Sequence, residues 1–143
     1  MRDLLHGRRV DVDGRYVHLD AVALDWPPER PPALLVGARG PKTLRAAGEL
    51  ADGVILDNDV TPDRVRAARA EVDKGRAAAG RTDRYQVVVY IEPPTGLPLD
   101  ELAGVLAATI HDLERAGATS VVFQGSGDAP DPIPLLAALT TTS

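Results

Sequence analysis

The stretch ALLVGARGPKTLRAAGELADGVILDND, residues 33–59, decides the fold. An apolar run leads through Gly37 and Gly40 into a helix-like segment that starts at Pro41, and a second apolar run follows Gly53. Proline at the first helical position and glycine just past the last are the usual residues at helix ends. The stretch therefore predicts a strand, a helix and a second strand in succession.

The same rhythm continues along the chain. Four short apolar runs, none of which alternates cleanly, predict strands buried on both faces: Leu34–Val36, Val54–Leu56, Val87–Ile91 and Val121–Phe123. Four segments predict helices: Pro41–Asp52, Asp63–Ala79, Leu99–Ala116 and Ile133–Leu139. Strands that alternate with helices form a parallel sheet with right-handed crossovers.

Four parallel strands are half of a (β/α)8 barrel, which needs ~250 residues. The 143-residue chain is therefore either a small open α/β sheet or half a barrel whose sheet edges find partners. We predict an α/β fold of parallel βαβ units, a partial (β/α)8 TIM barrel of about four strands preceded by a β-hairpin. A single domain is expected over residues 1–143, with the hairpin segment in 1–26 and the half-barrel in 33–143.

The hairpin prediction rests on RRVDVDGRYVHL, residues 8–19. Asp-Gly between alternating runs is a strong signal for a two-residue turn with positive φ at both positions. Such a turn pairs Val10 with Val17 and Val12 with Arg15. It places four apolar side chains on one face: Val10, Val12, Val17 and Leu19.

The amino-acid composition limits the classes of function that the chain can have. The formal charge is −5, from 16 basic and 21 acidic residues, and no basic face stands out, which argues against nucleic acid. No apolar run is long enough to cross a membrane. The chain has no cysteine, which excludes disulfides and thiolate metal sites and suits a reducing cytoplasm.

The Gly37–Gly40 loop joins a strand to a helix N-terminus, where backbone N–H groups and the helix dipole favour an anion. Glycine lets a phosphate approach the backbone closely, and Arg39 can add a charged fork. The alternative is that these glycines serve only the turn's backbone angles.

Other candidate chemistry is sparse. His6, His18 and His111 share no metal-ligand spacing, so we predict no metal site. Acidic residues follow two of the strands: Asp57, Asp59 and Glu92. Glu92 is a candidate for a polar contact with a coenzyme, and no catalytic base is assigned.

Several segments resemble one family. PPALLVGARGPKTLRAAGELADGVIL (31–56) is similar to the central segment of the luciferase-like monooxygenase family, particularly its branch that uses the deazaflavin coenzyme F-420 (F420). Three further segments resemble what surrounds it in the family: VDVDGRYVHLDAVAL, TPDRVRAARAEVDKGRAAAGR and LERAGATSVVFQG.

The resemblance implies a (β/α)8 barrel that transfers hydride with FMN or F420. It also implies that backbone groups hold the coenzyme phosphate, which gives six candidate cofactor-binding residues: Gly37, Ala38, Arg39, Gly40, Gly53 and Val54. The last two rest on the resemblance alone. A helix C-cap and a core strand are the competing interpretation for them.

The family's N-terminal strands have no counterpart here, so the chain is expected to be the C-terminal half of such an enzyme. Its partners would be a flavin-type coenzyme, a small-molecule substrate, and either further copies of itself or a second chain with the missing strands. One alternative is a non-catalytic α/β module that assembles through exposed sheet edges. Another is an unrelated nucleotide-binding fold, which the missing dinucleotide fingerprint disfavours.

Overall fold

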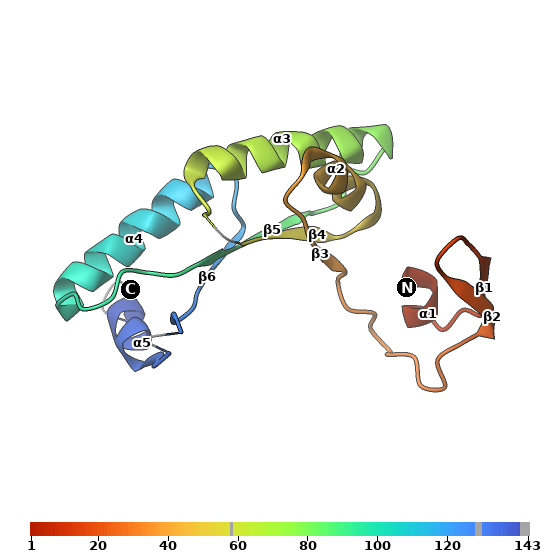
Figure 1. The fold of residues 1–143 in the computed structure, drawn as a ribbon, viewed down its shortest axis with the longest axis horizontal. Coiled ribbons are helices and arrows are strands. Elements are labelled where there is room, and N and C mark those ends of the chain that lie inside the picture. Colours follow the sequence, from red (N-terminus) through yellow and green to blue (C-terminus); the bar gives the residue numbers. More distant parts are fainter. Residues whose placement is uncertain (58, 128–129, 141–143) are drawn as a thin grey trace. The chain divides into compact units, whose positions relative to one another are not determined.

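A computed structural model describes residues 1–57, 59–127 and 130–140. The chain divides into two compact units, Met1–Leu34 and the remainder from Leu35 onward. Figure 1 traces both along the chain. Each unit is described on its own.

The first unit holds a short helix α1 (Arg2–Leu5) and an antiparallel pair, β1 (Val10–Asp13) and β2 (His18–Val22). The hairpin exists, but the predicted two-residue turn is wrong. The strands are joined by residues 14–17, where the N–H of Gly14 donates to the carbonyl of Val17 at 2.9 Å.

The register of the hairpin also differs from the prediction, because Val10 pairs with Val22 and Val12 with Leu19. Two polar contacts accompany the observed register. The Asp13 carboxylate lies 2.7 Å from Nδ1 of His18. The Asp11 carboxylate accepts from the N–H of Ala21 at 2.6 Å, where Ala21 takes a positive φ of 49° beside a ladder irregularity. Neither Asp13 nor Gly14 has positive φ, and Val12 and Val17 are exposed.

The second unit is a four-stranded parallel sheet in the order β3-β4-β5-β6. Its strands are β3 (Leu35–Gly37), β4 (Gly53–Leu56), β5 (Gln86–Ile91) and β6 (Ser120–Phe123). Its helices are α2 (Pro41–Leu50), α3 (Pro62–Ala78), α4 (Leu99–Arg115) and α5 (Ile133–Thr140). The four predicted strands and four predicted helices are confirmed, with ends that shift by one or two residues.

Local chemistry explains where the helices begin and end. Pro41 and Pro62 occupy first helical positions, and the Thr61 hydroxyl accepts from the N–H of Arg64 at 3.3 Å as an N-cap. Gly80 and Gly117 follow α3 and α4 with positive φ, which glycine adopts without steric cost.

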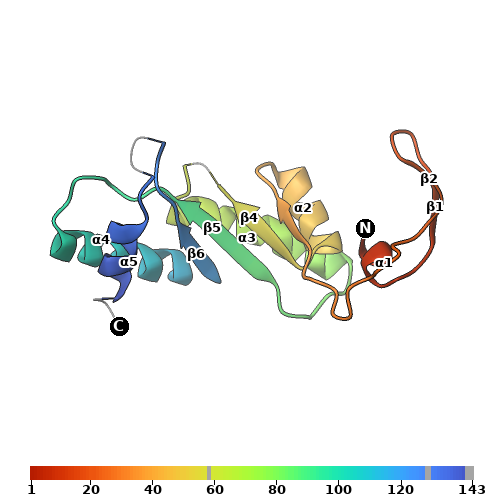
Figure 2. The ribbon, with the colours of Figure 1, turned by 90° about the horizontal axis from the view of Figure 1, so that it is seen from below.

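Helices α2, α3 and α4 cover one face of the sheet, which Figure 2 shows with the strands in front of the helices. The core lies in this layer. It includes Val54, Val87 and Val89 of the strands, Val65 and Val72 of α3, and Leu113 of α4. Sequential strand order with the helices on one side is the arrangement of a (β/α) barrel rather than of a doubly wound sheet. The predicted partial barrel is thus confirmed.

The strand register defines what the opposite face presents. One row across the sheet consists of Gly37, Ile55, Val88 and Ser120, and the row above it includes Tyr90 and Val122. Because side chains alternate between faces along a strand, Asp57 follows on the same side as Ile55, and Glu92 on the same side as Tyr90. The carboxyl end of this face is therefore polar, and the row of Gly37, Ile55, Val88 and Ser120 below it is apolar or small.

Two helices meet closely because of glycine. A Cβ at Gly48 of α2 would collide with the Val72 carbonyl of α3, and one at Gly75 of α3 with the Arg45 carbonyl of α2. Backbone therefore packs against backbone at this crossing.

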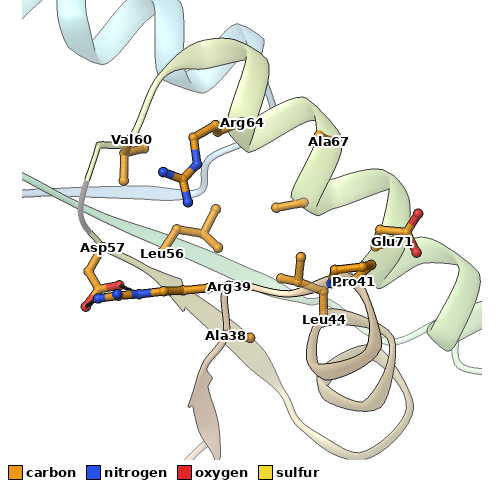
Figure 3. Close-up of a pocket in the computed structure, with 11 residues that line it drawn as sticks. Ala38, Arg39, Pro41, Leu44, Leu56, Asp57, Val60, Arg64, Ala67 and Glu71 are labelled. Atoms are coloured by element: carbon orange, nitrogen blue, oxygen red, sulfur yellow. Dashed lines mark hydrogen bonds and ion pairs between the residues drawn. The ribbon is translucent and has the colours of Figure 1, made fainter.

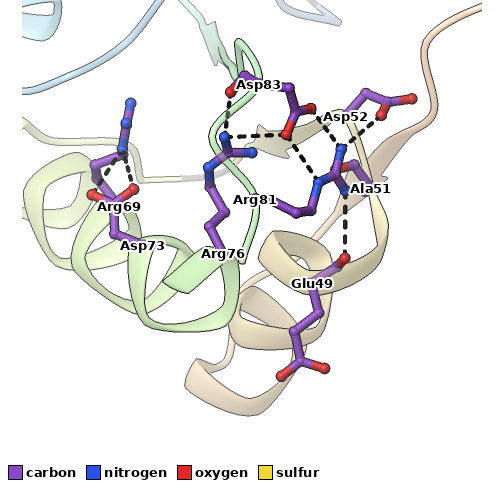
Figure 4. A network of polar contacts seen from close by, with 8 residues as sticks. All are labelled: Glu49, Ala51, Asp52, Arg69, Asp73, Arg76, Arg81 and Asp83. Atoms are coloured by element: carbon purple, nitrogen blue, oxygen red, sulfur yellow. Dashed lines mark hydrogen bonds and ion pairs between the residues drawn. The ribbon is translucent and has the colours of Figure 1, made fainter. Parts of the chain in front are cut away.

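The amino end of the sheet is closed by an arginine network (Figure 4). Arg81 donates to the Ala51 carbonyl at the end of α2 (2.6 Å), to Asp52 (3.0 Å) and to Asp83 (2.7 Å). Arg76 donates to the Asp83 carbonyl and lies over the ring of Tyr85, 4.9 Å from its centroid. In a barrel this end is where residues serve stability rather than chemistry.

Across the described residues, no helix combines the length and the apolar character that crossing a bilayer requires.

Candidate functional site

The predicted glycine loop lies at the carboxyl end of the sheet. Gly37 is the last residue of β3, and Gly40 is the N-cap of α2 with extended backbone. Ala38 between them is buried, and its N–H donates to the carbonyl of Ile55 at 3.3 Å. This bond anchors the loop to β4, so that its position follows from the sheet.

Turn geometry does not account for Gly37 and Gly40. Neither has positive φ. A Cβ built at either one would meet no atom within 4 Å, so no neighbouring group requires glycine there. The first helical hydrogen bond of α2 runs from the Leu44 N–H to the Gly40 carbonyl, which leaves the amides of Lys42 and Thr43 ahead of it. The loop therefore offers open space beside backbone donors, which is the shape that a phosphate group needs.

Arg39 extends from this loop to Asp57 at the end of β4 (Figure 3). Its Nε donates to Oδ1 at 3.1 Å and its Nη2 to Oδ2 at 3.2 Å. Hydrogen bonding to Arg39 is the main cause that lowers the pKa of Asp57, and the same bond raises the pKa of Arg39. Both side chains are more than half exposed, so the pair is open to solvent.

A hollow of about 210 Å³ lies between the start of α2, the end of β4 and α3. Ala38, Leu44 and Leu56 form an apolar wall. Arg64 reaches into the hollow from α3, and Arg39 borders it on the other side (Figure 3). Arg39 and Arg64 thus both line this hollow, and the Arg39 guanidinium is held at its Asp57 end.

A larger hollow of about 540 Å³ lies across the carboxyl ends of the strands. Its lining is mostly polar: Arg39, Asp57, Asp59, Tyr90, Glu92 and Gln124 are joined by Val60 and Ile91. Glu92, a candidate from sequence, is therefore at this site. Sequence reasoning missed Tyr90 and Arg64, although the period-two alternation of β5 puts Tyr90 on the same face as Glu92.

Gly53 and Val54 do not join the loop. Both are buried at the amino end of β4, where Gly53 pairs with Leu35 at the start of β3. A Cβ at Gly53 would lie 2.5 Å from the Leu35 side chain and 2.8 Å from the Gln86 carbonyl. Packing therefore explains this glycine, and Val54 belongs to the core.

The histidines form no site. His18 pairs with Asp13 in the first unit, and within the described ranges no group of three or more His, Cys, Asp or Glu side chains could hold a metal ion.

Two curated relatives are similar in sequence. A 5,10-methylenetetrahydromethanopterin reductase of Archaeoglobus fulgidus is 35% identical over 91 residues, which cover 63% of this chain and 27% of that protein. An F420-dependent hydroxymycolic acid dehydrogenase of Mycobacterium tuberculosis is 31% identical over 136 residues, which cover 93% of this chain and 33% of that protein. The chain thus spans about a third or less of the length of these relatives.

Two solved structures share the fold. One is a coenzyme F420-dependent tetrahydromethanopterin reductase from Methanopyrus kandleri, with a TM-score of 0.74 and 20% identity. The other is an F420-dependent secondary alcohol dehydrogenase in complex with an F420–acetone adduct, with a TM-score of 0.78 and 16% identity. Each match covers 99% of this chain and 58% of the other.

A sequence model of the luciferase-like monooxygenase family matches residues 1–96, about two thirds of the chain. A relative that is similar over 93% of this chain supports the same assignment, and both findings confirm the resemblance seen in the sequence. The chain belongs to the luciferase-like monooxygenase family.

Proposed function

We propose that this chain is the portion of an F420- or flavin-dependent oxidoreductase that holds the coenzyme phosphate, at the Gly37–Gly40 loop. The observation that carries the proposal is the open space at Gly37 and Gly40, which no backbone angle or neighbouring atom explains. The relatives named above as F420-dependent favour F420 over FMN.

The roles of the residues follow from their positions. The backbone of residues 37–40 and the first turn of α2 would bind the phosphate, and Arg39 would add charge-assisted hydrogen bonds. The hollow bordered by Tyr90, Glu92 and Gln124 would receive the rest of the coenzyme and a small-molecule substrate. The coenzyme supplies the hydride chemistry, and the protein supplies binding and orientation. Gly53 and Val54, proposed from resemblance as further contacts, would act only by keeping β4 in place.

The test is a fluorescence titration of F420, and separately of FMN, with the full chain. Gly40→Leu is expected to weaken coenzyme binding at least tenfold, because the new side chain fills the space beside the loop. Gly104→Leu is the matched control, since Gly104 lies on an exposed part of α4 and a Cβ there also meets no atom within 4 Å. Equal affinities for the two variants would contradict the phosphate loop.

A second candidate is a non-catalytic module that assembles through its sheet. The observation that favours it is that β3 and β6 each pair on one side alone within the described sheet. Further copies of the chain, or a second chain with additional strands, would cover these edges. Under this proposal the chain associates but binds no coenzyme. A cytoplasmic location stays a prediction from the cysteine-free sequence.

A further inference from the structure

The Arg39 guanidinium is directed away from the glycine loop that it is expected to serve. Figure 3 shows its side chain running from the loop to Asp57, while Pro41 and the first turn of α2 lie on the other side. Two parallel hydrogen bonds of 3.1 and 3.2 Å hold it there. For Arg39 and the α2 amides to share one phosphate group, the guanidinium must leave Asp57.

The ion pair also lies where the two hollows meet. Among the described residues, only Arg39, Asp57 and Val60 line both the smaller hollow beside α2 and the larger one at the strand ends. A ligand with its phosphate at the loop and its remaining atoms in the larger hollow would therefore meet this pair.

The Arg39–Asp57 ion pair is of a kind that a phosphate group can displace. Both side chains are more than half exposed, and exposed ion pairs contribute little to stability. A phosphate group carries more charge than a carboxylate and three acceptor oxygens. Once released, the Asp57 carboxylate would border the larger hollow as a hydrogen-bond acceptor.

We propose that Arg39 and Asp57 form an exchangeable clasp: a phosphate group takes Arg39, and the freed Asp57 accepts a hydrogen bond from an N–H or O–H group of the same ligand. The inference rests on the proposed phosphate loop. It makes Asp57 an internal competitor that lowers the affinity for phosphate alone. It also defines the ligand class as a phosphate ester with a nearby hydrogen-bond donor.

The experiment measures inorganic phosphate binding to the full chain by calorimetry. Asp57→Asn removes the competitor, so phosphate is expected to bind about fivefold more tightly. Asp59→Asn is the matched control. It makes the same charge change in the same hollow, no hydrogen bond joins it to Arg39, and Asn tolerates its positive φ of 48°. Less than about a twofold change is expected for the control.

A double-mutant cycle isolates the clasp. In an Arg39→Ala background, Asp57→Asn is expected to change phosphate affinity by less than about twofold, because nothing is left to release. If Asp57→Asn and Asp59→Asn raised the phosphate affinity equally, the effect would come from the loss of any negative charge near the site. That result would overturn the clasp. Weaker binding by Asp57→Asn would also overturn it, because Asp57 would then orient Arg39 instead of competing for it.

The outcomes separate this inference from the proposed function. Phosphate binding that Gly40→Leu abolishes but Asp57→Asn leaves unchanged would refute the clasp and keep the phosphate loop. No phosphate binding by the wild type or by any variant would refute both.

Discussion

Glycine is present for different structural reasons at different positions of this chain. At Gly53 a Cβ would overlap the Leu35 side chain and the Gln86 carbonyl, whereas at Gly37 and Gly40 it would meet nothing within 4 Å. Stability experiments can therefore distinguish the glycine that packing requires from those that a ligand would explain.

We expect Gly53→Ala to lower the free energy of unfolding by about 1–3 kcal/mol, because the methyl group overpacks the space between β3 and β5. Gly40→Ala is expected to cost less, about 0.5–1 kcal/mol, because alanine is less favourable than glycine at the N-cap position that Gly40 occupies. Urea unfolding followed by circular dichroism measures both. A large loss in Gly40→Ala would show that the loop glycine is structural.

Carboxylates paired with arginine contribute to the loss of stability in acid. Hydrogen bonding to Arg81 lowers the pKa of Asp83, and hydrogen bonding to Arg45 lowers that of Glu71. A carboxylate with a lowered folded-state pKa stabilises the fold above its unfolded pKa, near 4, and loses that contribution as pH falls through the folded value. Asp83→Asn is thus expected to flatten the decline in unfolding midpoint between about pH 5 and pH 2. If the unfolding midpoint of this variant fell with pH as it does in the wild type, the Asp83–Arg81 pair would not contribute to stability.

The sequence could identify the glycine loop but could not say why the glycines are there. Composition and spacing are the same for a glycine that serves a turn and for one that leaves room for a ligand. The three-dimensional packing separates them: a Cβ at Gly53 would overlap the Leu35 side chain, and one at Gly37 or Gly40 would not meet a neighbour. Tyr90 and Arg64 were missed because their role depends on which strand ends and helices lie together.

At the scale of elements, the helices and parallel strands followed from local signals. Proline at the start of α2 and α3 and glycine after α3 and α4 marked their limits within two residues. The hairpin was predicted less well. Its observed turn and register come with side-chain contacts of Asp11 and Asp13, which the alternation of apolar residues does not encode.

At the crossing of α2 and α3, a glycine-to-alanine change is expected to lower stability, whereas on an exposed helix face it normally raises it. Alanine normally stabilises a helix by about 1 kcal/mol relative to glycine. At Gly75, however, a Cβ would collide with the Arg45 carbonyl of α2, so we expect Gly75→Ala to lose about 2–3 kcal/mol through overpacking. Gly104→Ala on the exposed side of α4 is expected to gain stability instead. Thermal unfolding of the two variants compares these signs, and a gain at Gly75 would mean that the helices can separate at little cost.

At the scale of the molecule, one sheet face and two sheet edges have no covering element within the described four-stranded unit. Helices α2, α3 and α4 cover the other face, and the open one presents Ile55, Val88 and Val122 in its central rows (Figure 2). Neither edge carries the charged residues or prolines that usually discourage strand pairing: β3 is LVG and β6 is SVVF. Strand order alone could predict this incomplete sheet, but not what covers it.

These features predict that the full chain associates at micromolar concentration, which sedimentation velocity over a hundredfold dilution series measures. Val122→Lys puts a charge on the open face of the edge strand β6 and is expected to shift the distribution toward the monomer. Leu99→Lys, at an exposed apolar residue that begins α4, is the matched control and is expected to leave the distribution unchanged. Circular dichroism of each variant separates a loss of association from a loss of folding. A wild-type chain that sediments as a monomer throughout would exclude the sheet as an association surface. In that case a phosphate site at the Gly37–Gly40 loop would have to function on the four-stranded unit alone.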